Sequence, residues 1–238
     1  MTKDAVLAIL RKENDYISGE HISRLLGVSR AAVNTAVKAL RAEGYEISSS
    51  TNKGYHLDAV PNSISAQELA AYLDEARMQT VECLASVDST NNRLRELALA
   101  GAPNGQVVLA NEQTQGKGRR GRAFASPQDN GIYLSILFHP DTLPTDIVEI
   151  TAWTAVATNN AIEEVCGVRA GIKWVNDLVI DRKKICGILT EMSVESESGY
   201  IQYLIIGIGI NVNGQAEDFP AEIRSTATSL AMETGKTH

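Results

Sequence analysis

The sequence predicts an α+β protein with two folded parts, a small helical domain and a larger domain built on a mixed β-sheet. In residues 1–60, apolar residues recur at helical intervals and a short hairpin pattern follows them. From residue 80 onward, β segments and helical segments alternate at first, and several β segments then follow one another, which favours a mixed sheet over a doubly wound parallel one. The predicted boundaries are residues 1–60, a linker with a short helix over 61–79, and the larger domain over 80–238.

Composition and charge restrict the class of protein. The net charge of −7 argues against a protein that coats nucleic acid non-specifically, although residues 1–60 carry +1 and the remainder −8. No apolar run approaches the ~18 residues that span a bilayer, and the N-terminus lacks a signal-peptide pattern. The three cysteines form no metal-binding spacing and are expected to be buried thiols. We therefore expect a cytoplasmic protein.

The first 60 residues contain start and stop signals that predict three short helices. Ser18 and Ser29 are good N-cap residues for the second and third helices. Gly27 and Gly44 end those two helices. Two short helices around a glycine-containing turn predict a helix-turn-helix.

The third helix and the segment after it are expected to contact DNA. Residues 45–50 and 54–57 flank a Thr-Asn-Lys turn, so they predict a hairpin, and a hairpin that follows a recognition helix is a wing. Arginine and asparagine can read base edges, whereas lysine and threonine suit phosphates. The predicted DNA-binding residues are Arg30, Asn34, Thr35, Lys38 and Lys53, with Arg41 on the same outward face. A small helical bundle used for protein contact is the alternative.

The larger domain is expected to contain both kinds of element. The expected strands are 81–87, 106–111, 132–138, 168–174, 178–180, 184–193 and 200–212. The expected helices are 91–100, closed by Gly101, and 145–165. Before them, Ser65 is expected to cap a short helix that ends near Met78.

Gly116–Arg122, with the sequence GKGRRGR, is the most informative segment of the chain. Glycine lets a backbone turn tightly and approach a ligand closely, and arginine gives a planar fork of donors that matches carboxylate and phosphate oxygens. The segment therefore predicts a loop that wraps a small anionic molecule. Its spacing also fits a dinucleotide-binding fingerprint, but the sequel, which includes Pro127, does not open the helix that this fingerprint needs. A solvated basic loop is the plainer alternative.

Four other motifs accompany this loop. They are DSTNN at 88–92, KWVNDL at 173–178, KICGILTE at 184–191 and GIGINVN at 207–213. In this order and spacing, the set resembles the biotin protein ligase family over about residues 81–230. The N-terminal segment is similar to the winged helix-turn-helix of the bifunctional members, which are also biotin operon repressors. The resemblance implies a catalytic domain of the class II aminoacyl-tRNA synthetase-like type.

The resemblance implies an ATP-dependent enzyme. Biotin and ATP, with Mg²⁺, would give biotinyl-5′-AMP and pyrophosphate, and biotin would then pass to a lysine of a carboxylase carrier domain. The implied partners are that carrier domain, operator DNA and a second copy of the chain in a ligand-promoted homodimer. Three alternatives remain: a ligase whose N-terminal domain no longer binds an operator, a DNA-binding regulator that senses biotin or its adenylate without catalysis, and a related lipoate-type ligase. Lys184 with the basic loop argues against the second, and the full GKGRRGR loop favours biotin over lipoate.

The resemblance also assigns residues, motif by motif. The implied biotin-binding residues are Ser89, Thr90, Asn91, Gln113, Lys117, Gly118, Arg119 and Lys184. The implied nucleotide-binding residues are Arg120, Arg122, Phe124, Asn176, Asp177 and Asn211. Lys184 and Arg119 are the implied catalytic residues, because two anions must be neutralised as they meet. No metal site made by the protein alone is expected, and Mg²⁺ would accompany ATP near Asp177.

Some of these residues have structural roles as alternatives. Ser89 or Thr90 would also suit a helix N-cap, Asp177 a strand turn, and Lys184 an exposed basic run. The chain also departs from the family pattern, since Lys117 replaces a commoner arginine and keeps the charge without the fork. The family's small C-terminal β-barrel is expected to be missing.

Overall fold

The computed structural model describes residues 2–238, and the chain forms two compact units, Met1–Ser63 and Ile64–His238. The residues predicted to be a linker, 61–79, are divided between these units. Ile64 belongs to the larger unit, where its backbone N–H donates to Asn111 Oδ1 at 2.7 Å. Within residues 2–238, no helix is both long enough and apolar enough to cross a membrane.

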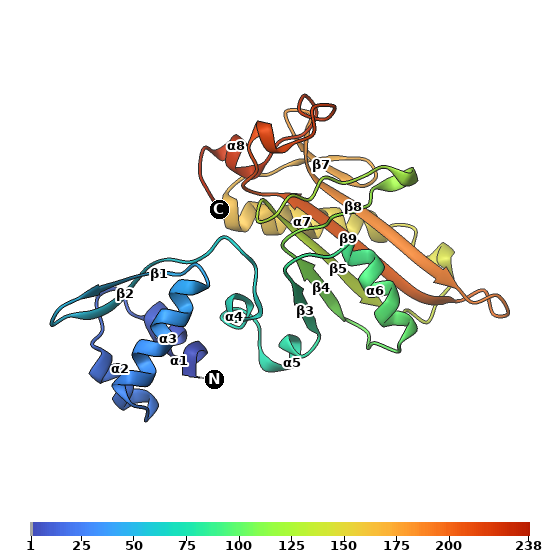
Figure 1. Cartoon of the computed structure of the whole chain (residues 1–238). Helices are drawn as coiled ribbons and strands as arrows, with labels where there is room; N and C mark the ends of the chain where they lie inside the picture. The colour runs from blue at the N-terminus through green and yellow to red at the C-terminus, as the bar shows by residue number, and fades with distance from the viewer. Residues whose placement is uncertain (1) are drawn as a thin grey trace. The chain divides into compact units, whose positions relative to one another are not determined.

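The smaller unit consists of three helices and a hairpin (Figure 1). Its elements are α1 (Thr2–Lys12), α2 (Gly19–Leu26), α3 (Arg30–Ala42), β1 (Glu46–Ser50) and β2 (Gly54–Ala59). The Ser18 and Ser29 side chains cap α2 and α3 by accepting backbone N–H groups at 3.1 Å. Gly27 ends α2 with a φ of 65°, in the left-handed region that glycine tolerates. The predicted helix-turn-helix and hairpin are therefore both present.

The larger unit is built on a seven-stranded sheet with the order β3-β4-β5-β9-β8-β7-β6 (Figure 1). The strands are β3 (Val81–Leu84), β4 (Val107–Ala110), β5 (Gly131–Phe138), β6 (Gly171–Lys173), β7 (Asp177–Ile180), β8 (Lys183–Val194) and β9 (Ile201–Asn211). β3 and β4 pair in parallel, and every other neighbouring pair is antiparallel. The mixed-sheet prediction is confirmed.

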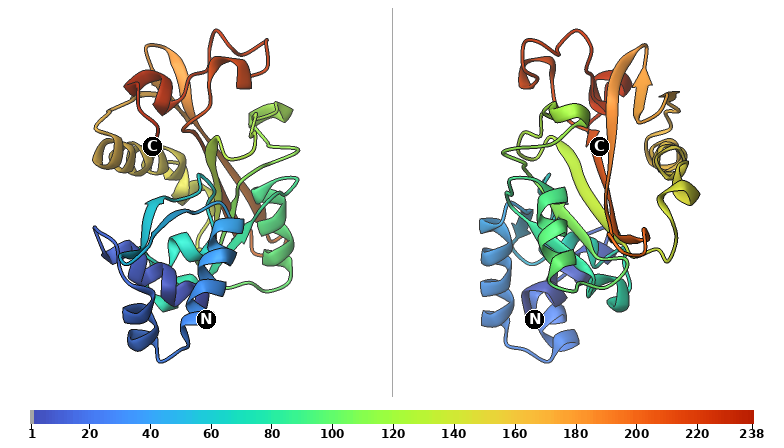
Figure 2. Two further views of the ribbon diagram at one scale, coloured as in Figure 1. Left: turned by 60° about the vertical axis from the view of Figure 1, so that its left-hand side comes forward. Right: turned by 90° about the vertical axis from the view of Figure 1, so that its right-hand side faces the viewer.

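Two helices, α6 (Thr90–Leu99) and α7 (Ile150–Cys166), cover opposite faces of this sheet (Figure 2). The helices of the unit are α4 (Ala66–Leu69), α5 (Glu75–Met78), α6 (Thr90–Leu99), α7 (Ile150–Cys166) and α8 (Leu230–Thr234). Leu94 of α6 packs in one buried cluster with Val108 and Ile205. Ile162 of α7 belongs to another cluster, which contains Ile206. Side chains therefore alternate between two cores along β9.

That alternation decides where a ligand can reach the sheet. Ile205 lies beneath α6, and the next two residues of β9 on this face are Gly207 and Gly209. An added Cβ at Gly207 would lie 2.2 Å from Asn91 Oδ1, and one at Gly209 would lie 2.5 Å from the Phe124 ring. The two glycines thus let other groups approach the backbone of β9 just beyond the core beneath α6.

Two expected helices differ in extent. The helix expected from Ser65 to Met78 is divided into α4 and α5, because Asp74 caps a new helix by accepting the Arg77 N–H at 2.8 Å. The helix expected over 145–165 begins at Ile150, after a separate 3₁₀ turn over Pro144–Ile147.

Candidate active site

The basic segment Gly116–Arg122 is a small hairpin. The Phe124 N–H donates to the Gly116 carbonyl at 2.8 Å, and the Gly118 N–H donates to the Arg122 carbonyl at 2.7 Å. Arg120, at the tip, has a left-handed φ of 55°. Gly116 cannot be replaced easily, because an added Cβ would lie 2.3 Å from the Phe124 carbonyl oxygen. The hairpin therefore fixes the backbone positions that carry Lys117, Arg119, Arg120 and Arg122.

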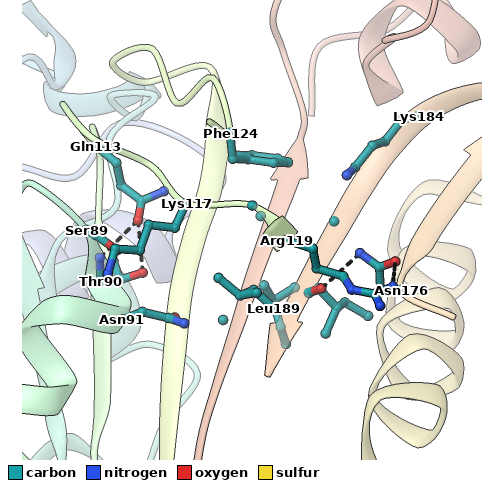
Figure 3. Close-up of a pocket in the computed structure, with 16 residues that line it drawn as sticks. Ser89, Thr90, Asn91, Gln113, Lys117, Arg119, Phe124, Asn176, Lys184 and Leu189 are labelled. Carbon is teal, nitrogen blue, oxygen red and sulfur yellow. Dashed lines mark hydrogen bonds between the residues drawn. The ribbon is translucent and has the colours of Figure 1, made fainter. Parts of the chain in front are cut away.

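This hairpin, the start of α6 and the glycine-bearing parts of β8 and β9 enclose a pocket (Figure 3). The structure brings residues from all five motifs to this place, although they are far apart in the sequence. The eight residues predicted to bind biotin all line it: Ser89, Thr90, Asn91, Gln113, Lys117, Gly118, Arg119 and Lys184.

A second cavity shares Gly118, Arg119, Phe124, Asn176 and Lys184 with the first. The six residues predicted to bind the nucleotide all line it: Arg120, Arg122, Phe124, Asn176, Asp177 and Asn211. Two further cations line it that sequence reasoning missed, Lys173 and Arg182. Lys173 is the first residue of the KWVNDL motif and Arg182 the first of a basic run. The sequence therefore shows their charges but does not predict that they belong to the site.

One end of the pocket is lined mainly by neutral polar groups, with Lys117, whose ammonium donates to Asn92 Oδ1, beside them (Figure 3). The Thr90 N–H donates to Gln113 Oε1 at 2.9 Å, and Gln113 Nε2 donates to Ser126 Oγ at 2.8 Å. Ser89 occupies the N-cap position of α6, but its hydroxyl makes no capping hydrogen bond. The structural alternative for Ser89 therefore does not account for its hydroxyl. This end has donors and acceptors suited to a neutral polar group.

Asn91 closes the floor beside Gly207. Its Nδ2 donates to Glu191 Oε2 at 2.7 Å, and Arg95 donates to Glu191 Oε1 at 2.9 Å (α6 supplies both donors). Sequence reasoning gave Glu191 no role, because its partners depend on strand pairing. That pairing sets Glu191 opposite Ile205 on β9, two residues from Gly207.

The other end of the pocket is charged. Lys184 Nζ forms an ion pair with Asp177 Oδ1 at 2.8 Å, and Asn176 Nδ2 also donates to that oxygen at 3.1 Å. Arg119 Nη1 donates to Asn176 Oδ1 at 3.0 Å (Figure 3). These four residues form one connected chain where the two cavities meet. Lys184, for which the sequence also allowed a surface position in a basic run, is thus 33% exposed and held by an ion pair.

Phe124 separates the pocket from the second cavity. Its ring lies over Gly187 and Gly209, which are directly paired on β8 and β9. Lys184 Nζ lies 5.5 Å from the ring centroid, within range of a cation–π interaction. Tyr133 packs against the ring with its edge, at a centroid distance of 6.4 Å. The aromatic ring is thus held beside the charged end.

Asn211 lines the second cavity, but its side chain binds backbone. Its Nδ2 donates to the carbonyls of Thr228 at 3.0 Å and Lys184 at 3.3 Å. The backbone of Lys184 also pairs with residues 226–228. Its N–H donates to the Thr226 carbonyl at 2.7 Å, and its carbonyl accepts the Thr228 N–H at 2.9 Å. The described contacts of Asn211 therefore position Lys184.

The donor set does not fit a metal ion held by the protein alone. Within residues 2–238, no group of three or more His, Cys, Asp or Glu side chains is placed to hold a metal. Asp177 is the one carboxylate among the residues that line either cavity, and it is already paired with Lys184. Burial raises the pKa of the nearby Cys186 thiol to about 12, so this thiol stays neutral.

The five residues predicted to bind DNA are all exposed: Arg30, Asn34, Thr35, Lys38 and Lys53. Arg41, on the same helix, is committed elsewhere, because its Nη2 and Nε donate to the Ile47 carbonyl at 2.6 and 2.9 Å. It ties α3 to β1 and is not free to read bases.

Residues 83–211, more than half of the chain, match the biotin/lipoate A/B protein ligase family. The chain belongs to this family. Residues 2–56 match a helix-turn-helix domain family. The bifunctional ligase/repressor BirA of Bacillus subtilis is 40% identical over 237 residues, which cover 99% of this chain and 72% of that protein. Its namesake from Escherichia coli is 29% identical, over 87% of this chain and 62% of that protein.

Solved structures of family members have the same catalytic fold. The biotin protein ligase from Aquifex aeolicus in complex with biotin and ATP matches with a TM-score of 0.56 and 33% identity, over 67% of this chain and 63% of that one. The Leishmania major ligase in complex with biotinyl-5-AMP matches with a TM-score of 0.54 and 26% identity, over 66% and 65%. This chain thus spans less than two thirds of either ligase.

Proposed function

We propose that this chain is a biotin protein ligase that also acts as a biotin-responsive repressor. The observation that supports the ligase most directly is the pairing of its two cavities. The polar groups at one end of the first pocket suit the ureido ring of biotin, and the pocket meets a cavity lined by six cations and one acid, which suits ATP. Lys184 and Arg119 line both cavities, where the carboxylate of biotin would meet the α-phosphate.

The first step joins two anions. A carboxylate oxygen of biotin attacks the α-phosphorus of ATP, an O–P bond forms, and pyrophosphate leaves with the electrons of the broken P–O bond. Lys184 and Arg119 neutralise the charge that collects there, and such preorganised charge stabilises a transition state more effectively than water does. Asp177 and Asn176 hold these two cations at 2.8 and 3.0 Å, which limits the reorganisation required.

The second step is acyl transfer. The amine of a carrier lysine attacks the acyl carbon, AMP leaves, and the amine loses a proton. This step depends mainly on orientation, because AMP is a good leaving group. Ser89, Thr90 and Gln113 would fix the ureido end so that the acyl carbon faces the carrier.

The nucleotide would occupy the basic cavity. Phe124 would stack on adenine, and Arg120 and Arg122 would meet phosphate oxygens. Mg²⁺ would enter with ATP, because it is usually bound by substrate phosphates, several waters and one or two carboxylates. Asp177, which is paired with Lys184 in the structure, is the carboxylate that lines this cavity and would lie nearest to it.

Incubation of the chain with biotin, ATP, Mg²⁺ and a carrier domain tests the ligase. We expect pyrophosphate release and a carrier whose mass rises by one biotinyl group. Lipoate and octanoate in place of biotin test the lipoate-type alternative. Pyrophosphate release with lipoate but not with biotin would overturn the assignment, and tight biotin binding without pyrophosphate would leave a non-catalytic sensor.

The repressor function is supported by the exposed residues of α3 and the wing. One winged helix makes few base contacts, so specific binding would need a dimer on an inverted repeat. The larger unit offers a surface for this dimer at strand β6, an edge of the sheet whose Ile172 is 42% exposed and is followed by Trp174 at 76%. The ATP, carrier and operator that this function needs are found in the cytoplasm.

A titration of the chain on its own biotin-gene promoter tests the repressor. We expect the DNA affinity to rise when biotin and ATP are added, together with the dimer fraction in sedimentation. Equal DNA affinity with and without ligands would remove the biotin response, and no binding would remove the repressor.

A further inference from the structure

Most of the six cations that line the basic cavity have no partner in the protein. Lys184 is paired with Asp177. Arg119 donates to Asn176. Within residues 2–238, the side chains of the other four form no hydrogen bond or ion pair: Lys173, Arg120, Arg122 and Arg182. An adenylate has a single phosphate, so four unpartnered cations point to a ligand with more phosphate groups than the adenylate has.

Two of these four cations are carried by unfavourable backbone conformations. Arg120, at the tip of the basic hairpin, has a φ of 55°, and Arg182, in the turn between β7 and β8, has a φ of 68°. A residue with a Cβ enters this left-handed region only at a cost. The other non-glycine residues of 2–238 with a positive φ are of types that enter it more readily: Asn52, Asp129 and Asp181. Both arginines line the same cavity, and such strain commonly collects at ligand sites.

The register of the sheet orders the cavity from β9 to β6. One row of directly paired residues crosses these four strands, in the order Gly209, Gly187, Asp177 and Lys173. Directly paired residues point to the same face of a sheet. The Phe124 ring covers the two glycines, and Lys173 lies two strands beyond Gly187, about 10 Å away at the usual strand spacing. If adenine stacks on Phe124, the row leads away from it toward Lys173.

We infer that Lys173 and Arg182 bind the β- and γ-phosphates of ATP, the part that leaves as pyrophosphate. The inference rests on the proposed ligase function and deepens it. Lys184 and Arg119 would neutralise the reacting carboxylate and α-phosphate, whereas Lys173 and Arg182 would contact only the leaving group. Both of their side chains are exposed in the cavity, so a ligand can reach them, and the arginine fork suits two phosphate oxygens at once.

Arg182→Gly separates this role from a structural one. Glycine suits a left-handed turn position, so the substitution should raise the melting temperature by about 2–4 °C while it removes the phosphate contact. Lys183→Ala is the matched control, because Lys183 is the next residue of the chain, carries the same charge and lines neither cavity. It measures the effect of losing one positive charge near the cavity without losing the contact.

Calorimetric titration gives the Kd for pyrophosphate and the Kd for biotinyl-5′-AMP in the wild type and the variants. We expect Arg182→Gly and Lys173→Ala each to raise the Kd for pyrophosphate about tenfold, as expected for the loss of one charge-assisted hydrogen bond. The KM for ATP in pyrophosphate release should rise with it. The Kd for biotinyl-5′-AMP should stay within about twofold, because the adenylate lacks the two phosphates, and Lys183→Ala should change neither Kd by more than about twofold.

Three outcomes would overturn the inference. They are an unchanged Kd for pyrophosphate in either Arg182→Gly or Lys173→Ala, an equal rise in the Kd for biotinyl-5′-AMP, and a melting temperature of Arg182→Gly that falls as the affinity falls. The last would show that Arg182 holds the turn and does not bind the leaving group. Failure of the ligase assignment has a different outcome, because the wild type itself would then release no pyrophosphate with biotin and ATP.

Discussion

The ammonium of Lys184 and the carboxylate of Asp177 form an ion pair 2.8 Å long between neighbouring strands β8 and β7. The pair lies where the first pocket meets the basic cavity, and its side chains are 33% and 20% exposed. In this partly desolvated place a charge acts over several ångströms more strongly than in bulk water.

Lys184→Ala should slow adenylate formation by at least about 10²-fold, because a charge contact made in the transition state is lost. Biotin should still bind, though more weakly, since the end of the pocket formed by Ser89, Thr90 and Gln113 is unchanged. Single-turnover pyrophosphate release measures the rate, and Lys183→Ala on the same strand is the control because Lys183 lines neither cavity. Release by Lys184→Ala at the wild-type rate would remove this residue from the mechanism.

Substitution of two glycines of β9 should affect the KM values for biotin and ATP differently. In Gly207→Ala the new Cβ would meet Asn91 Oδ1 at 2.2 Å, so the KM for biotin should rise most. In Gly209→Ala it would meet the Phe124 ring at 2.5 Å, so the KM for ATP should rise most. We expect each principal effect to be about tenfold or more, because overpacking commonly costs about 1–3 kcal/mol.

Gly171→Ala is the control for this pair, since its Cβ would meet Val179 at an ordinary 3.6 Å. If both pocket variants raised the same KM, the assignment of the two cavities to two substrates would be wrong.

Asn211→Ala should lower the free energy of unfolding by about 1–3 kcal/mol, because the carbonyls of Lys184 and Thr228 lose a buried donor. Urea unfolding measures this change. The rate of adenylate formation should fall with it, since the backbone of Lys184 is less well held. Unchanged stability together with a raised KM for ATP would instead support direct nucleotide contact, as the sequence predicted.

Lys53→Ala should lower the salt dependence of operator binding by about one unit in the slope of log K against log salt, because one phosphate contact is lost. Lys3→Ala is the control, since Lys3 is paired with Glu43 at 2.5 Å and is not among the residues predicted to bind DNA. Equal slopes for wild type and Lys53→Ala would remove the wing from the DNA interface.

The anion site could be predicted from the clustered cations of residues 116–122. The individual residues that line the two cavities were assigned from the resemblance of five motifs to the family. The roles of Glu191 and Arg41 could not be predicted, because each depends on a partner from another element. Glu191 meets Asn91 only because β8 and β9 pair in one register, and Arg41 meets Ile47 only because the hairpin folds back on α3.

The boundaries of irregular elements could not be predicted from the sequence either. Asp74 starts a second helix within a segment that shows one helical pattern, because its side chain supplies a cap. Such local competition between side chain and backbone leaves little trace in hydrophobic spacing.

The hydrogen bonds between Lys184 and residues 226–228 give the site a reciprocal property. Any ligand that needs the Lys184 ammonium in place will also protect this segment from opening, and any partner that holds the segment will tighten binding of that ligand by the same factor. The amide hydrogens of Lys184 and Thr228 would report this from the two sides of one β-bridge. Their exchange with solvent deuterium should slow together when biotin and ATP are bound.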